Sequence, residues 1–158
     1  MLYPILLMTG VFVVGFIILR NLKLQLTKVS LRSLKIYIEK RFEGQDIIMK
    51  TFEANFLGLK SHGPRQRRGI GALVLTKDQL SFSLLGRRRE VVIPVEKMCF
   101  VTLKNHYMEQ DLRFPMLYVE YPIKKFMDHG AWFVDEPEKW MDAIKLLVDS
   151  NQETVKDA

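Results

Sequence analysis

The sequence predicts a mainly β, α+β domain that follows an N-terminal transmembrane helix. Three observations lead to this fold class. Residues 2–19 carry no charged side chain, short runs from Asp46 onward alternate apolar and polar residues, and the segment after Val134 has apolar residues at helical spacing. With 158 residues in all, the chain has room for one domain of ordinary size besides the helix.

The uncharged run has the length of a membrane span. It consists almost wholly of Leu, Ile, Val, Phe, Met and Gly, and about 20 helical residues cross a hydrocarbon core. A cleaved signal peptide would need a basic start and a small-residue cleavage site, whereas this chain starts Met-Leu-Tyr-Pro. A buried core helix is rarely so long and uncharged at the terminus of a small chain. We therefore assign residues 1–20 to a single-pass transmembrane helix.

Basic residues follow this span and none precedes it. They are Arg20, Lys23, Lys28, Arg32, Lys35, Lys40 and Arg41. The positive-inside rule then places the N-terminus outside and the rest of the chain in the cytoplasm, at the inner membrane of the cell. The net charge of +6 indicates an anionic partner, and it is concentrated in residues 20–68, where twelve Lys and Arg face four Asp and Glu.

Residues 21–45 predict a basic amphipathic juxtamembrane segment. Leu31, Leu34, Ile38 and Phe42 stand at helical spacing, and Gly44 is a suitable stop, so we expect a helix over about residues 28–42. Such a helix has two alternative locations. It lies along an anionic membrane leaflet, or it packs against the domain.

Residues 46–150 predict seven strands and a closing helix. The expected strands are 46–60, 71–76, 80–85, 91–94, 98–104, 116–121 and 131–134. Residues 105–113 are expected to form a solvated loop. Asp135 as a cap, Pro137 in the first turn and Trp140 on an apolar face predict the helix, and residues 151–158 are expected to be a polar tail.

This order of elements resembles the pleckstrin-homology (PH) superfold. The resemblance is specific at Gly58-Leu59-Lys60-Ser61, at residues 67–76, at Arg89-Glu90-Val91-Val92-Ile93-Pro94 and at Ala131-Trp132-Phe133-Val134-Asp135 with Trp140. The chain is similar to small bacterial membrane-anchored PH-like proteins, related in style to PH and GRAM modules, of unassigned function. This resemblance implies a bent seven-stranded barrel with one end closed by the C-terminal helix.

The sequence shows no pattern typical of an enzyme or a cofactor site. His62, His106 and His129 lie in separate segments, and Cys99 is the lone cysteine and is expected to pack as a small apolar residue. Phosphate-binding loops, nucleophile elbows and zinc-protease motifs are absent from the sequence. We therefore expect no catalytic residues, no metal and no cofactor.

Basic clusters are the candidate binding residues. The resemblance implies that they meet at one end of the barrel, where related domains hold anionic headgroups. The candidates are Lys60, Arg65, Arg67, Arg68, Arg87, Arg88, Arg89, Lys124 and Lys125. Guanidinium groups match phosphate or carboxylate oxygens, so the partner is an anionic lipid or an acidic peptide, unless the cations only form a solvated surface. Nucleic acid is not expected, because no aromatic residues interleave with the arginines.

The sequence thus favours a membrane-tethered binding or scaffold module. It would recognise anionic lipid headgroups or a partner protein, as an accessory subunit of a membrane complex. The alternative is a pure protein adaptor that binds a peptide along the barrel edge beside the C-terminal helix.

We predict that the chain stays in the membrane fraction on alkaline carbonate extraction, because residues 2–19 are uncharged. A C-terminal reporter that is active only in the cytoplasm should be active. Release of the chain into the supernatant, or activity of a C-terminal reporter that works only outside the cell, would show the topology to be wrong.

Overall fold

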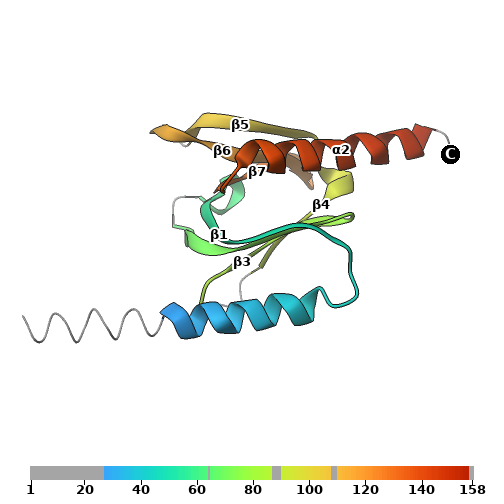
Figure 1. The fold of residues 1–158 in the computed structure, drawn as a ribbon. Helices are drawn as coiled ribbons and strands as arrows, with labels where there is room; N and C mark the ends of the chain where they lie inside the picture. The colour runs from blue at the N-terminus through green and yellow to red at the C-terminus, as the bar shows by residue number, and fades with distance from the viewer. Residues whose placement is uncertain (1–26, 64, 87–89, 108–109, 157–158) are drawn as a thin grey trace, which may run out of the picture.

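In the computed structural model, one antiparallel sheet curls into a barrel, and a helix packs on either side of it (Figure 1). The structure describes residues 27–63, 65–86, 90–107 and 110–156. The strand order is β4-β3-β2-β1-β7-β6-β5. The strands are β1 (Ile47–Leu59), β2 (Gly69–Thr76), β3 (Gln79–Leu84), β4 (Glu90–Pro94), β5 (Phe100–Tyr107), β6 (Gln110–Ile123) and β7 (Phe126–Phe133). The expected seven strands and C-terminal helix are therefore confirmed.

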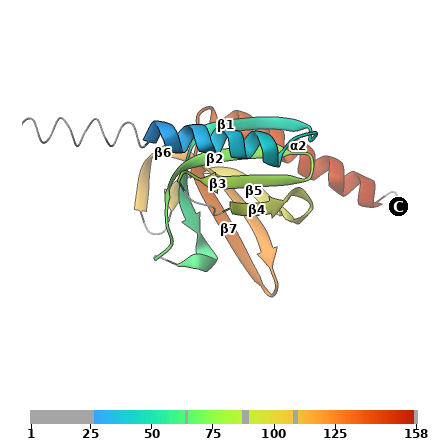
Figure 2. The same cartoon turned by 90° about the horizontal axis from the view of Figure 1, so that it is seen from below.

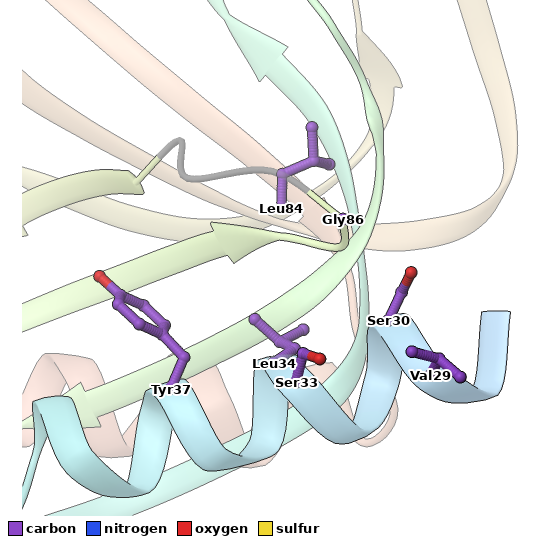
Figure 3. A pocket seen from close by; sticks show the side chains of 7 residues that line it. All are labelled: Val29, Ser30, Ser33, Leu34, Tyr37, Leu84 and Gly86. Atoms are coloured by element: carbon purple, nitrogen blue, oxygen red, sulfur yellow. The ribbon is translucent and has the colours of Figure 1, made fainter. Parts of the chain in front are cut away.

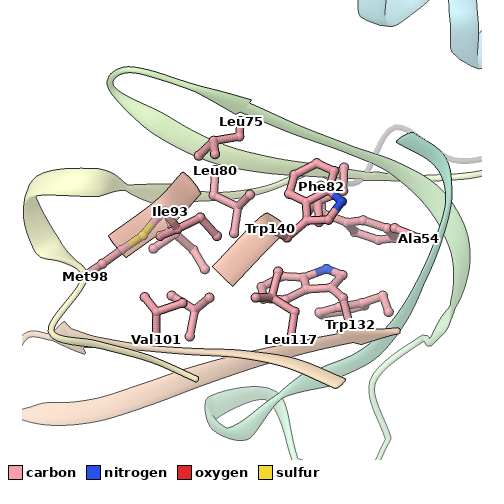
Figure 4. Close-up of a cluster of buried hydrophobic side chains, with 14 of the residues drawn as sticks. Ala54, Leu75, Leu80, Phe82, Ile93, Met98, Val101, Leu117, Trp132 and Trp140 are labelled. Atoms are coloured by element: carbon pink, nitrogen blue, oxygen red, sulfur yellow. The ribbon is translucent and has the colours of Figure 1, made fainter. Parts of the chain in front are cut away.

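The core fills the inside of the barrel with side chains from alternate strand positions (Figure 4). Leu80, Phe82 and Leu84 of β3 point inward, as their alternation predicts. Helix α2 (Pro137–Lys156) lies against β5, β6 and the short helix η2 (Val95–Lys97). Trp140 of α2 is buried in this core, so the inner face expected for the helix is confirmed.

Residues 27–41 form a helix that packs on the outer face of the barrel. Its Leu34 and Ile38, with Phe42 just beyond it, cover Ala72 and Val74 of β2. The helix expected over residues 28–42 is therefore present, and of its two expected locations the structure shows the one against the domain.

This helix buries a sheet face that would otherwise meet water. Ser81 and Ser83 of β3 pair with Val74 and Ala72, so they share the outer face, and both are buried. Glu90 pairs with Ser83 in the sheet, and its carboxylate lies 3.9 Å from the guanidinium of Arg41. A fragment starting at residue 46 would expose this face, so the helix is part of the folded unit.

Strands also include two stretches outside the expected ones, namely the loop expected at residues 105–113 and the gap left between residues 121 and 131. Residues 105–113 belong mostly to the β5–β6 hairpin. Tyr107 anchors this hairpin, because it is buried and donates a hydrogen bond to the Gly58 carbonyl at 2.9 Å. Residues 122–130 also continue β6 and β7 around a two-residue turn at Lys124 and Lys125. Neither stretch alternates apolar and polar residues in the way that marked the other strands, because their side chains lie beyond the barrel core.

The C-terminal helix is also longer than expected. It continues to Lys156 and therefore includes most of the segment that we interpreted as a polar tail. Cys99, expected to pack as a small apolar residue, is exposed just before β5. The predicted transmembrane helix at residues 1–20 lies outside the described residues. Within the part of the chain that the structure describes, no helix is long and apolar enough to cross a bilayer.

We predict that Ile38→Ala lowers the unfolding free energy of the full chain by about 2 to 5 kcal/mol, because Ile38 is only 1% exposed under the sheet. Ile36→Ala is the matched control on the same helix, because Ile36 is 57% exposed, and it should change stability by less than about 0.5 kcal/mol. Denaturant unfolding followed by circular dichroism measures both. Equal effects of the two substitutions would mean that the helix is not docked in solution.

Candidate functional site

Three connections that carry basic residues open at one end of the barrel, which we call the mouth. The sheet register requires this, because the end of β1 pairs with the start of β2, and the end of β3 pairs with the start of β4. The end of β1 also pairs with β7 at Gly130, just before the β6–β7 turn. The connections β1–β2, β3–β4 and β6–β7 therefore share the mouth.

The β1–β2 connection is held in place by the side-chain amide of Gln66. Its Oε1 accepts a hydrogen bond from the Leu59 backbone N–H at 2.6 Å. Its Nε2 donates to the carbonyls of Leu59 and Gly63 at 2.7 and 2.8 Å. Gly58 has a φ of 131°, and a Cβ there would meet the Gln66 amide at 2.5 Å, so glycine lets the amide approach the strand. These bonds fix the backbone on either side of Arg65.

A buried carboxylate ties the same connection to β7. Asp128 accepts hydrogen bonds from the Ser61 backbone N–H at 2.8 Å and from the Ser61 hydroxyl at 2.6 Å. The Tyr121 hydroxyl donates a third bond to it at 3.1 Å. Burial alone would raise the pKa of Asp128, but the hydrogen bonds from Ser61, the His129 backbone and Tyr121 outweigh it, so its pKa lies below the usual value. Asp128 therefore acts as an ionised structural clamp.

Beside this clamp, aromatic and ionisable side chains pack on the outer face of β5, β6 and β7. The His129 ring lies 4.7 Å from Tyr118 and 5.5 Å from Tyr107, between ring centroids. Burial lowers the pKa of His129, so its imidazole is neutral at pH 7. Burial also raises the pKa of Tyr107 to about 12, which keeps its hydroxyl a donor. These rings therefore pack against one another on the outer face of the sheet.

A hollow of about 380 Å³ lies at the mouth between β4, the short helix η1 (Lys60–His62) and the β6–β7 hairpin. Its polar lining includes Ser61, His62, Lys97 and Lys124. Glu90 is the carboxylate that lines it, and that group is paired with Arg41 outside the hollow. The hollow therefore offers cations and hydrogen-bond donors to an anion.

The predicted site residues fall into three groups. Lys124 lines the mouth hollow, and Arg67 lines a smaller adjoining pocket that shares His62 with it. Lys60, Arg65, Arg68 and Lys125 are exposed on the same connections but line neither space. Arg87, Arg88 and Arg89 lie outside the described residues. The binding role of all nine stays a prediction.

Sequence reasoning missed Lys97, which reaches the mouth hollow from η2. Lys97 is the only basic residue between Arg89 and Lys104, so no cluster drew attention to it. It also missed Asp128, whose partner Ser61 is 67 residues away along the chain. Asp128 lies outside the strands that the sequence predicted, so nothing in the sequence indicated that it is buried.

Two further open spaces lie away from the mouth hollow. One, of about 490 Å³, separates helix 27–41 from the end of β3 and is lined by Val29, Ser30, Ser33, Leu34, Tyr37, Leu84 and Gly86, none of them charged (Figure 3). The other is a groove of about 650 Å³ beside the start of α2, where Phe114 and Phe133 lie among the carboxylates of Glu53, Asp135, Glu136 and Glu138. Among the described residues, no group of three or more histidine, cysteine or acidic residues is placed to hold a metal ion.

Comparisons with known proteins show the fold. No family model matches the sequence, and no curated protein matches it. A solved structure described as the Vps36 N-terminal PH domain superposes with a TM-score of 0.54 and 11% identity, over 70% of this chain and 84% of that chain. A chain from "The 8S snRNP Assembly Intermediate" gives a TM-score of 0.49 and 9% identity, over 68% of this chain and 82% of that one. The first likeness confirms the PH-like fold that the sequence resemblance implied.

We predict that Asp128→Asn destabilises the full chain by about 1 to 3 kcal/mol at pH 7, because the amide cannot replace all the hydrogen bonds of the carboxylate. Since the folded pKa of Asp128 is depressed, its contribution is fully present above the unfolded pKa of about 4 and is lost as the pH falls through the folded pKa. Urea unfolding at a series of pH values should show the unfolding free energies of the unaltered chain and of the variant becoming equal below about pH 4. A difference independent of pH would contradict this role.

Proposed function

We propose that this chain is a membrane-tethered PH-like binding module whose mouth recognises anionic lipid headgroups on a membrane surface, with residues 1–20 as the tether. The observation that supports it best is the gathering of exposed cations around the mouth hollow. Lys97 and Lys124 line the hollow, and further Lys and Arg residues occupy the connections around it. The assignment to the inner membrane, with the domain in the cytoplasm, belongs to the same proposal.

The electrostatics of the mouth favour an anion. Among the residues that line the hollow, Lys97 and Lys124 stand against one carboxylate, Glu90, which also lies 3.9 Å from Arg41. Each Lys or Arg near an anionic leaflet contributes about 1 kcal/mol to binding. Several such cations at one end of the barrel together give affinity for an anionic membrane. No closed, stereospecific pocket is needed for this, and the mouth hollow is open.

An extended lipid surface fits this end better than an acidic peptide. The described cations come from the β1–β2 connection, the β6–β7 turn and η2, so they do not follow one groove. Exposed apolar side chains, Phe126 and Met127, lie beside Lys124 and Lys125. A lipid interface accepts both kinds of side chain together, with charges at the headgroups and apolar groups below them.

A second candidate function is protein adaptor activity, and the groove beside α2 favours it. Phe114 is 62% exposed there, next to Pro115 and Pro137, and the carboxylates around the groove suit a basic peptide. This groove lies beside the C-terminal helix, as in the adaptor hypothesis from the sequence. The two functions use different surfaces, so one accessory subunit of a membrane complex could carry both.

The proposed function is tested with the full chain held in neutral phosphatidylcholine nanodiscs. Sucrose-loaded vesicles of phosphatidylcholine, with or without phosphatidylglycerol, are added and sedimented. The nanodiscs should sediment with the anionic vesicles only, and less as salt increases, because screening shortens the reach of the cations.

The variant that tests the mouth carries Arg65→Ser, Arg67→Ser and Lys97→Ser. It should weaken binding to anionic vesicles at least about tenfold, given about 1 kcal/mol for each cation. The matched control carries Lys50→Ser, Lys77→Ser and Lys145→Ser, which removes the same charge from exposed positions on β1, the β2–β3 turn and α2. An equal loss in both variants would indicate net charge alone, and an absence of binding by the unaltered chain would leave the adaptor function as the leading candidate.

A further inference from the structure

The end of the β6–β7 hairpin exposes an unusual combination of side chains. This hairpin tip consists of Ile123, Lys124, Lys125, Phe126 and Met127. Phe126 is 80% exposed, Met127 49% and Ile123 38%. Hairpin turns in water are commonly built from Gly, Asn and Asp, and contiguous apolar exposure of this kind marks an interaction site.

The hairpin tip projects beyond the body of the barrel. The last pair between β1 and β7 is Leu59 with Gly130, and the last pair between β5 and β6 is Phe100 with Glu120. From Tyr121 onward, β6 and β7 pair only with each other. Figure 2 shows this orange hairpin extending from the barrel on the same side as the blue-green η1 segment. The tip can therefore reach a surface before the strands of the barrel do.

The base of the hairpin is held in place. Tyr121 and Asp128 face each other across the hairpin and are hydrogen-bonded, and Asp128 also holds Ser61 of η1. A two-stranded hairpin is marginally stable alone, so these bonds are needed to keep the projecting strands paired. The tip is thus an extension whose direction is set by the barrel.

The turn itself keeps a lysine where the backbone favours glycine. Lys124 has a φ of 52°, in the left-handed region that L residues other than Asn and Asp rarely adopt. Lys125 completes the turn, and both lysines are exposed. A lysine with its charged end on a flexible stem can reach headgroup phosphates while neighbouring apolar groups lie deeper. The strained backbone at Lys124 is explained if its charged side chain is needed to contact the headgroups.

We propose that the hairpin tip is a membrane wedge: Phe126, with Ile123 and Met127, enters the interfacial layer of an anionic bilayer while Lys124 and Lys125 contact the headgroups. The proposal rests on the proposed function and adds a hydrophobic contribution to it. The occupant is the lipid surface, because charge complementarity and apolar exposure coincide at the tip. Phe114 differs in this respect, since it is also exposed but lies among carboxylates that an anionic surface would repel.

The wedge is tested on the full chain in the nanodisc assay described above. Cys99→Ser removes the single cysteine, and either Phe126→Cys or Phe114→Cys then carries an environment-sensitive fluorophore. With phosphatidylglycerol vesicles, the fluorophore at position 126 should shift its emission to the blue and become protected from an aqueous quencher. The fluorophore at position 114 should remain in water.

Two unlabelled variants separate the hydrophobic from the electrostatic part. Phe126→Ser should weaken binding on the order of tenfold at every salt concentration, because a large apolar side chain loses its burial. Lys124→Gly should leave the unfolding free energy unchanged or raise it, since glycine suits the backbone, yet weaken binding and reduce its salt dependence.

The outcomes distinguish this inference from the proposed function. If the nanodiscs sediment with anionic vesicles while the fluorophore at position 126 stays in water, the wedge is wrong and anionic binding stands. If both fluorophores shift equally, the tip has no special role and the wedge is again wrong. If the unaltered chain does not bind anionic vesicles at all, both proposals are overturned.

Discussion

β1 joins the two halves of the sheet, and its bend determines the shape of the barrel. Its first part pairs with β2 and its last part with β7, and the register shifts between Phe56 and Gly58. Phe56 then stacks on Phe82 at 5.0 Å and lies 5.6 Å from Trp132, between ring centroids, so the bend brings the two halves together around one aromatic cluster. Glycine at position 58, with a φ of 131°, allows the strand to turn there.

The same bend builds the mouth. Where β1 leaves β2, its end continues into η1, and Ser61 reaches Asp128 on β7. The β1–β2 connection is thus held against the β6–β7 hairpin, although the two are far apart in sequence. Gln66 completes the arrangement by folding the connection back onto Leu59. Hydrogen-bonded polar groups therefore fix the connection that carries these surface cations.

Much of the fold could be predicted from the sequence, because the barrel strands have one apolar face. Leu80, Phe82 and Leu84 alternate cleanly, and Leu34 with Ile38 shows helical spacing. Prediction failed where strands leave the core. Asn105 to Arg113 mixes polar residues with a few apolar ones, and His106 and Asp111 form an exposed pair at 2.9 Å, so no regular hydrophobic period marked the β5–β6 hairpin. The candidate cations were visible as clusters, but Lys97 and the Asp128 clamp depend on contacts between distant segments.

The docking of helix 27–41 changes what a tether would do to this domain. A flexible linker lets a domain sample all orientations, so a weak surface interaction must first overcome the loss of rotational freedom. Here Leu34, Ile38 and Phe42 pack the helix on the sheet, so the helix is part of the folded domain and not a flexible linker. A segment inserted in the bilayer and continuous with this helix would restrict the directions in which the mouth can face. Part of the orientational entropy of binding would then be lost when the chain folds, and not again at each encounter with the surface.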